Sequence, residues 1–438
     1  MFRKTGIAIL LLSAQAAAQS PMSLSLAEAV DHALKNNEDI LIAENSVQAA
    51  RASVREARAD ALPNITLSGQ YLRNIQRPVF FFPSFTDPNV QVAIRVGSLN
   101  AYSTALSLSQ PLFRAGKVGK AMKVARLFTR FSEEGQRSTR GDVILAVHEA
   151  YYQVLLANRL LEVNRQNEAQ TLRHLERTRK LFAQGQVSEF DTLRAYVSSM
   201  NIRPAVIAAE NAVEVTTNTL KNLIGVPYDT ELELRDSLSY QPEPLPSLEE
   251  AIRLAEAQRP ELRQMQLEVR MRQLNIGIIR ADILPSLNLI GTWQSQAQSD
   301  RSDFGDQGFV KSLSAGLQLT IPIFDGMRTY ARMDKARAEH RTAVYTLQKI
   351  REEIQVQVKS LLYSVEEARK TIEAQQGNIT QARRALELAE LRYREGQATL
   401  LDLDDSRLAL NQAQTNYYQS VYNYLIARVN LDRALGVL

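Results

Sequence analysis

The chain carries one sequence pattern twice, and this internal repeat restricts its fold more than any other feature. Two early segments, Leu26–Val30 and Ala59–Pro63, recur 222 positions later as Leu248–Ile252 and Ala281–Pro285. Three later matches are 211 positions apart, and they pair Gln110–Phe113, Gly185-Gln186 and Leu223–Val226 with Ile321–Phe324, Gly396-Gln397 and Ala434–Val437. The shorter offset places an insertion in the first copy. The collinear order predicts a tandem duplication, with repeats at 19–227 and 248–438 and a linker at 228–247.

The first 18 residues have the pattern of a secretory signal peptide. Arg3 and Lys4 precede an apolar stretch, and the small residues Ala16 to Ala18 provide a cleavage site. No other apolar run approaches the roughly 18 to 20 residues that a membrane-spanning helix needs. We therefore expect an exported chain that starts at Gln19 and has no helical anchor.

Composition excludes several classes of protein. Charged residues make up 23% of the 438 residues, too many for a bundle of membrane-spanning helices. The 52 basic and 48 acidic residues nearly balance, which argues against a dedicated nucleic-acid-binding protein. The absence of cysteine excludes disulfides, thiol nucleophiles and cysteine-ligated metals.

Long proline-free stretches predict long helices. No proline occurs between Pro111 and Pro204 or after Pro322, and apolar residues recur there at helical spacing. Glycine breaks divide each stretch into a helical hairpin with its tip near 185 or 396. Pro204 falls within the return helix of the first hairpin, where we expect a kink or a turn.

Four short segments alternate apolar and polar residues, at about 64–74, 101–112, 286–296 and 312–322. In the third, Leu287, Leu289 and Trp293 alternate with polar residues such as Asn288 and Thr292. Segments of about nine or ten residues fit tilted strands that cross a bilayer, with apolar side chains outward and polar ones inward. A small soluble sheet is the alternative, but its inner face would need apolar residues.

Four strands cannot close a barrel, and an open sheet edge in lipid leaves backbone groups without hydrogen-bond partners. Two copies would give eight strands, too few for an open lumen, whereas three copies give twelve. The pattern therefore predicts a cyclic trimer. The segments 76–99 and 297–309 then become outward-facing loops.

The order of these motifs in both copies resembles the TolC family of outer-membrane efflux proteins (outer membrane factors). The residues that carry the resemblance are the A-x-x-L-P segments ending at Pro63 and Pro285, the strand exits Gln110–Phe113 and Ile321–Phe324, Tyr393–Gly396 with Leu401–Leu403, and the closing Tyr422–Ile426 and Ala434–Gly436. It covers essentially the whole mature chain. The resemblance implies a mixed α and β membrane protein of two tandem repeats. A trimeric 12-stranded transmembrane β-barrel, four strands per chain, would continue into a long periplasmic α-helical barrel.

Two carboxylates after the second hairpin turn are candidate pore residues. Asp402 and Asp405 are three residues apart and so share one helix face, where they would either form acidic rings in a trimer or cap the return helix. The resemblance implies the first role, a periplasmic gate held by links that match Tyr393 and Asp191. Ala398 stands where the family has a basic gate residue. The sequence therefore does not predict whether the closed-state network is intact.

The two hairpin turns are candidate docking sites. Gly185, Gln186, Gly396 and Gln397 lie at the tips. An ordinary loop between helices is the plain interpretation. The resemblance implies that these tips dock a periplasmic adaptor (membrane fusion) protein.

No enzyme motif survives inspection, and we predict no catalytic residue, cofactor or metal. The four histidines are scattered and are expected to be solvated helix residues. The resemblance implies an exit duct in the outer membrane of a Gram-negative bacterium, passively conducting small molecules from an adaptor and an inner-membrane pump of resistance-nodulation-division, ABC or major facilitator type. The alternatives are the exit duct of a type I protein secretion system and a periplasmic coiled-coil scaffold.

Overall fold

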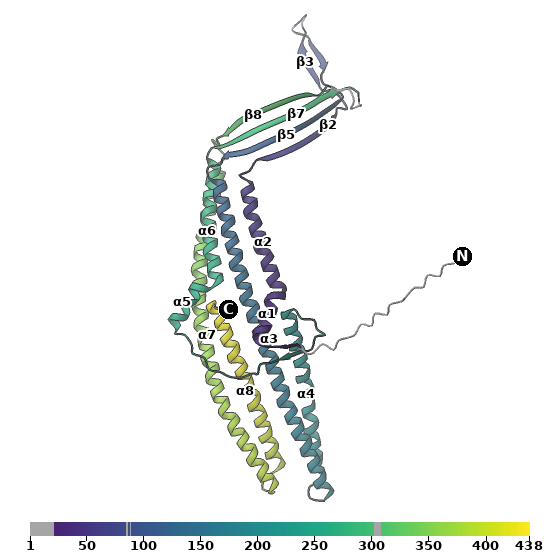
Figure 1. Cartoon of the computed structure of the whole chain (residues 1–438), viewed down its shortest axis with the longest axis vertical. Helices are drawn as coiled ribbons and strands as arrows, with labels where there is room; N and C mark the ends of the chain where they lie inside the picture. Colours follow the sequence, from purple (N-terminus) through teal and green to yellow (C-terminus); the bar gives the residue numbers. More distant parts are fainter. Residues whose placement is uncertain (1–21, 85, 88, 302–307) are drawn as a thin grey trace, which may run out of the picture. The chain divides into compact units, whose positions relative to one another are not determined.

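The computed structural model describes residues 22–438 except 85, 88 and 302–307, so the expected signal peptide lies outside the described residues (Figure 1). The chain divides into two compact units. The hairpin unit comprises the residues up to Ala43, Gln136–Pro260 and Arg351–Leu438; the sheet unit comprises Glu44–Gly135 and Glu261–Ile350. The unit boundaries fall inside four helices, α2 (Glu38–Ala59), α3 (Lys117–Ala183), α6 (Pro260–Arg280) and α7 (Arg328–Arg394).

Two helical hairpins make up most of the hairpin unit. α3 and α4 (Glu189–Ile224) form the first, and α7 and α8 (Leu400–Leu435) form the second. α3 and α7 have 67 residues each, and α4 and α8 have 36 each. Val143, Val147 and Val154 are buried along one face of α3 at helical spacing. This highly charged helix therefore packs through an apolar stripe on that face. In the described part of the chain, no helix is both long enough and apolar enough to cross a membrane.

Pro204 lies inside α4, which continues without a break to Ile224, so no turn opens there. Proline lacks the N–H that would bond to the carbonyl of Met200. Both residues are exposed, so water can bind the freed carbonyl. The helix therefore tolerates this proline.

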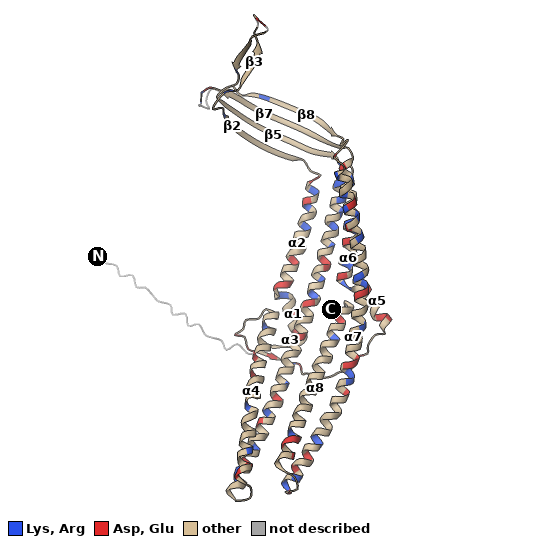
Figure 2. Cartoon of the chain, turned by 180° about the vertical axis from the view of Figure 1, so that it is seen from behind, with Lys and Arg blue, Asp and Glu red and all other residues tan. Residues whose placement is uncertain are grey.

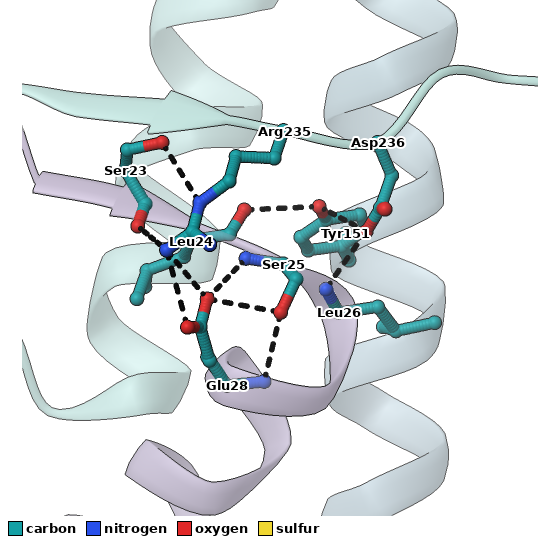
Figure 3. Close-up of polar contacts among 8 residues, drawn as sticks. All are labelled: Ser23, Leu24, Ser25, Leu26, Glu28, Tyr151, Arg235 and Asp236. Carbon is teal, nitrogen blue, oxygen red and sulfur yellow. Dashed lines mark hydrogen bonds and ion pairs between the residues drawn. The ribbon is translucent and has the colours of Figure 1, made fainter.

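The segment between the two halves is not a bare linker. Its β6 (Leu232–Leu234) pairs in parallel with β1 (Met22–Leu24) at the start of the described chain. Arg235 extends this pairing, because its N–H donates to Leu24 O at 3.0 Å and its side chain forms an ion pair with Glu28 at 3.0 Å (Figure 3). We call β1, β6 and these contacts the N-terminal clasp.

A buried tyrosine ties the N-terminal clasp to α3. The Tyr151 hydroxyl donates to Asp236 Oδ2 at 2.7 Å and lies 3.2 Å from Leu24 O (Figure 3). Asp236 Oδ2 also accepts a hydrogen bond from the N–H of Leu26, at 2.9 Å. Burial and the Asp236 carboxylate raise the pKa of Tyr151, which stays a hydrogen-bond donor.

Two short helices pack against the hairpins through alanines. α1 (Leu26–Asn36) buries Ala29 and Ala33 and contacts α4, whereas α5 (Leu248–Gln258) buries Ala251 and Ala255 and contacts α8. Alanine lets helices approach closely because it has no side chain beyond Cβ. α6 (Pro260–Arg280) and the 3-10 turn η1 (Ala281–Ile283) then lead from α5 to the second pair of strands.

The sheet unit contains one four-stranded antiparallel sheet, in the order β2 (Asn64–Arg73), β5 (Asn100–Phe113), β7 (Ser286–Ser299) and β8 (Val310–Thr320). The pairing of β5 with β7 joins the two halves of the chain. β2 and β8 are the edge strands, and neither has a second partner in the described chain.

The register separates the residues of the sheet into two chemically different faces. One row across all four strands consists of Leu67, Leu106, Trp293 and Leu313. The neighbouring row, on the opposite face, consists of Thr66, Ser107, Thr292 and Ser314. Successive residues of a strand point to opposite faces, so one face is apolar and the other carries hydroxyl groups.

A second hairpin lies within 76–99, which the sequence predicted only as a loop. β3 (Val79–Pro83) pairs with β4 (Gln91–Arg95), and Phe80 and Phe82 lie opposite Ile94 and Val92. These four side chains share one face, and all are exposed. The insertion of the first copy is therefore structured.

We predict that Gly436→Ala destabilises the fold more than Gly396→Ala does. The two glycines have φ values of 76° and 72°, so each alanine carries the same left-handed cost of about 1–2 kcal/mol. A Cβ on Gly436 would also lie 2.9 Å from the carbonyl carbon of Gln258, whereas nothing lies within 4 Å of one on Gly396. Thermal unfolding of both variants measures the difference; equal shifts would show that α5 moves aside without cost.

Candidate functional site: the ends of the helical hairpins

The two hairpin tips have the same turn geometry. Gly185 and Gly396 have φ values of 71° and 72°, and their N–H groups donate to Phe182 O and Tyr393 O. The N–H groups of Gln186 and Gln397 reach back to the carbonyls five residues earlier, at 2.9 and 2.8 Å. This pattern ends a helix at a left-handed residue and satisfies its last carbonyls. All four predicted tip residues are exposed.

Both return helices start with a capping box. In α8, Asp402 Oδ2 accepts from Thr399 N at 2.8 Å and from Thr399 Oγ1 at 2.7 Å. In α4, Asp191 Oδ2 accepts from Ser188 N at 3.1 Å and from Ser188 Oγ at 2.7 Å. These bonds lower the pKa of Asp402, so its carboxylate stays charged at neutral pH. Asp402 and Asp191 thus cap their helices, which is the second of the two roles left open for Asp402.

Asp405 lies one turn further along α8 and is exposed. Among the described residues it takes part in no hydrogen bond or ion pair within the chain. The Asp405 carboxylate can therefore interact with solvent or with another copy of the chain, whereas the Asp402 carboxylate is hydrogen-bonded to Thr399.

The neighbouring Asp404 is partly buried, which sequence reasoning missed. It forms an ion pair with Arg407 at 3.4 Å, with side-chain exposures of 24% and 12%. Burial raises the pKa of Asp404, against the opposing effect of Arg407 and of Arg194 on α4. This carboxylate therefore faces the inside of the hairpin unit.

Tyr393 lies between the two hairpins. Its ring centroid is 5.8 Å from that of His174 on α3. Burial and the nearby carboxylate of Asp191 raise the pKa of Tyr393. Within the described part of the chain, however, Tyr393 and Asp191 share no hydrogen bond, so their proximity is electrostatic.

His174 is buried, contrary to the solvated role expected of it. Only 9% of the residue is exposed, and its Nε2 lies 3.4 Å from Thr178 Oγ1. Burial, reinforced by Arg407 and Arg177, lowers the pKa of His174 to about 4. The ring is therefore neutral at physiological pH. His174 is three residues after buried Thr171 and four before buried Thr178, a spacing that could have revealed its position.

All four long helices contribute to this site: His174 from α3, Asp191 from α4, Tyr393 from α7, and Asp404 and Arg407 from α8. A small apolar cluster of Leu386, Ala389, Leu400 and Leu403 lies beside Tyr393 and holds the second hairpin closed. The arrangement joins two hairpins through partly buried polar groups. Among the described residues, no group of three or more His, Cys, Asp or Glu side chains is placed to hold a metal ion.

We predict that acid loosens the contact between the hairpins through His174. Because its folded pKa of about 4 lies below the ordinary 6.5, the unfolded state takes up the proton first. The stability that neutral His174 contributes is complete above pH 6.5 and is lost as the pH falls through about 4.

Thermal unfolding across this pH range should therefore be less pH-dependent in His174→Gln than in the wild type. His340→Gln, at a half-buried histidine of α7, should keep the wild-type slope. An unchanged slope in His174→Gln would show that other groups dominate the acid response.

The comparison with known proteins agrees with this architecture. The sequence model for "outer membrane efflux protein" matches residues 29–226 and 251–437. The outer membrane protein TolC of Vibrio cholerae is 24% identical over 416 residues, covering 94% of this chain and 91% of TolC. The alkaline protease secretion protein AprF of Pseudomonas aeruginosa is 27% identical over 347 residues, covering 77% and 70%.

A solved structure shows the same fold. The crystal structure of a membrane protein from Pseudomonas aeruginosa superposes with a TM-score of 0.77 at 24% identity, covering 94% of this chain and 93% of that one. The family match spans most of the chain in two segments, one in each half. The chain therefore belongs to the outer membrane efflux protein family, and it is an exit duct in the outer membrane of a Gram-negative bacterium.

Proposed function

We propose that this duct is a homotrimer with a 12-stranded transmembrane barrel, and that it forms the outer-membrane part of a tripartite efflux system. The observation that carries the proposal is the four-stranded sheet with two chemically opposite faces and two open edges. The apolar face would contact lipid, and the hydroxyl-bearing face would line an aqueous lumen.

The open edges support assembly from several copies. β2 and β8 present unpaired backbone groups, each of which would cost several kcal/mol in the hydrocarbon core of a bilayer. Pairing β8 of one copy with β2 of the next removes every edge. Eight strands from two copies would leave a lumen filled by side chains, whereas twelve strands from three copies leave room for solutes.

The hairpins carry a seam that also fits assembly. On α4 the apolar residues Phe190, Leu193, Val197, Met200 and Ile207 are 37–69% exposed. Their spacings of three, four, three and seven residues are those of a coiled-coil face. A helix of a second copy would cover this seam. The equal lengths of α3 and α7, and of α4 and α8, support the tandem duplication and a helical barrel of repeated hairpins.

The exposed turns at Gly185-Gln186 and Gly396-Gln397 support the docking of a periplasmic adaptor, because they are alike in geometry and because nothing lies within 4 Å of the position of a Cβ on either glycine. An inner-membrane pump would then deliver small molecules through the adaptor. The similarity to AprF favours a second candidate, the exit duct of a protein secretion system. Capture of the adaptor on the wild-type duct, followed by identification of its pump, separates the two.

The acidic residues support a cation-selective entrance. Three copies would place three exposed Asp405 carboxylates around the pore axis, one turn from the three capping Asp402 groups. Like charges held close together attract counter-ions. Tyr393 and Asp191 would stabilise the closed state by lying close together. Arg407 and Arg177 would supply the positive charge that Ala398, in place of a basic residue, does not provide.

We predict opposite outcomes for two adjacent substitutions on the edge strand β8. Leu317 lies in the row of Leu289 on the apolar face, and Gln318 lies in the row of Asn288 on the polar face. Leu317→Arg should cost about 2–4 kcal/mol in the membrane, whereas Gln318→Arg should be tolerated. The fraction of heat-resistant trimer in outer-membrane extracts measures both. Equal losses would reverse the assignment of the faces, and a wild-type monomer in detergent would end the trimer proposal.

We predict that Asp405→Asn lowers the preference for cations and weakens block by trivalent cations in single-channel recordings. The substitution removes a charge without disturbing the cap at Thr399. Asp334→Asn, at an exposed carboxylate of the sheet unit, serves as the control and should leave both properties unchanged. If Asp405→Asn behaves like this control, the carboxylate does not face the pore.

A further inference from the structure

The two helices that follow the strands of the sheet begin with basic residues. Neither α3 nor α7 has an acidic residue in its first turn. From Arg114 to Ser132 the chain has six basic residues and no acidic one. The N-terminal end of a helix carries partial positive charge, so cations there are unfavourable for the helix itself. Helix stability does not explain these residues.

Contacts within the chain account for only some of them. Lys117 forms an ion pair with Asp282 at 2.5 Å, and Lys120 donates to Gly277 O at 3.0 Å. Arg114, Lys123 and Arg332 are exposed, and none forms an ion pair with an acid that the structure describes. Their charges are therefore accessible to solvent and to a binding partner.

Exposed apolar side chains directly precede the basic residues at both strand exits. Phe113 is 54% exposed and is followed by Arg114, and Phe324 is 79% exposed and lies four residues before Arg328. The two exits share a strained turn, because non-glycine Ala115 and Met327 have positive φ values of 48° and 63°. Apolar residues are thus followed by basic ones at equivalent places in the two halves, and at the second exit Asp325 lies between them, where it accepts from Thr329 N at 2.9 Å and interacts electrostatically with Arg328.

We propose that these residues form a basic collar, consisting of Arg114, Lys123, Arg328 and Arg332, that binds anionic phospholipid headgroups at the periplasmic surface of the outer membrane. This inference rests on the proposed function, because it requires the sheet to cross the bilayer. The apolar strand exits would then lie among the acyl chains, with the collar at headgroup level. Figure 2 shows basic residues at the strand-proximal ends of these helices, with acidic residues among them.

Charge complementarity favours an anionic lipid over a further protein copy as the occupant. A second copy brings the same basic residues, and like charges repel. In a closed trimer the collar would contain about twelve cations around one ring, a concentration of positive charge that anionic headgroups neutralise. Arg58 and Arg280 are further basic residues in the last turns of α2 and α6, the helices that precede β2 and β7.

The single tryptophan provides a direct test. Trp293 lies on the apolar face of β7, where brominated acyl chains would quench its fluorescence. The full mature trimer is reconstituted in vesicles that mix phosphatidylcholine and phosphatidylglycerol, with one or the other brominated. We expect phosphatidylglycerol to bind about threefold or more tightly at low ionic strength. About 0.5 M salt should abolish this preference.

The triple variant Arg114→Gln, Lys123→Gln, Arg332→Gln should lose the preference. A control with the same change of charge, Arg173→Gln, Arg179→Gln, Arg383→Gln on exposed parts of the hairpin unit, should keep it. Equal binding of the two lipids by the wild type, or a preference retained by the collar variant, overturns the proposal.

Two further outcomes separate this inference from the proposed function. If brominated phosphatidylcholine does not quench Trp293 at all, the sheet is not in the bilayer, and the proposed function fails with it. If the triple variant does not assemble, the test uses the wild type alone. A preference for phosphatidylglycerol that salt abolishes supports the collar, and a preference that salt leaves unchanged overturns it.

Discussion

The antiparallel ladder between β5 and β7 is the interaction on which the rest of the structure depends. It runs from Asn100 paired with Ser299 to Phe113 paired with Leu287, and it joins strands from the two halves of the chain. Its register fixes which side chains share a face on all four strands, because β2 and β8 follow from it by direct pairing. A slip by one residue would exchange the apolar and hydroxyl-bearing faces. The ladder shifts register only near Pro111, where proline cannot donate a backbone hydrogen bond.

The hairpin unit is held together in a different way. Its helices are long and rich in charge, and they pack through narrow stripes of small and branched residues. At the tips this packing gives way to partly buried polar groups: His174, Tyr393, Asp404 and Arg407. A buried polar group that loses its partner raises the free energy of the folded state. A small movement of one hairpin therefore has a larger energetic effect on these polar contacts than on an apolar contact. Polar contacts of this kind would suit the periplasmic gate proposed for these hairpin ends.

The sequence predicted the two-faced sheet well, because a period of two leaves only two ways to assign residues such as Leu289 and Asn288. It also located the hairpin tips at Gly185 and Gly396, where a left-handed turn requires glycine. It did not predict β3 and β4, because Phe80 to Phe82 do not alternate with polar residues. The pairing of β1 with β6 was not predicted either, because each strand has three residues, too few to show an alternating pattern.

The site was harder to predict than the fold for a physical reason. Asp402, Asp404 and Asp405 are neighbours in the sequence, yet one caps a helix, one is partly buried beside Arg407, and one is exposed. The cap at Asp402 is local to α8, whereas the neighbouring hairpin, which brings Arg194 near Asp404, separates the roles of Asp404 and Asp405. Sequence spacing identifies which residues share a helix face, but it does not identify what that face meets.

The N-terminal clasp has a consequence for the order of folding. Leu26 bonds to Asp236 across 210 residues, so the first strand of the described chain has no partner until the segment between the halves has emerged. Local helices form in microseconds, whereas contacts between distant residues wait for the loop between them to close. A chain that emerges N-terminus first can thus build α3 and α4 while its leading strand is still unpaired. The closing of the clasp then marks the completion of the first half, and a partly exported chain cannot acquire the complete hairpin unit early.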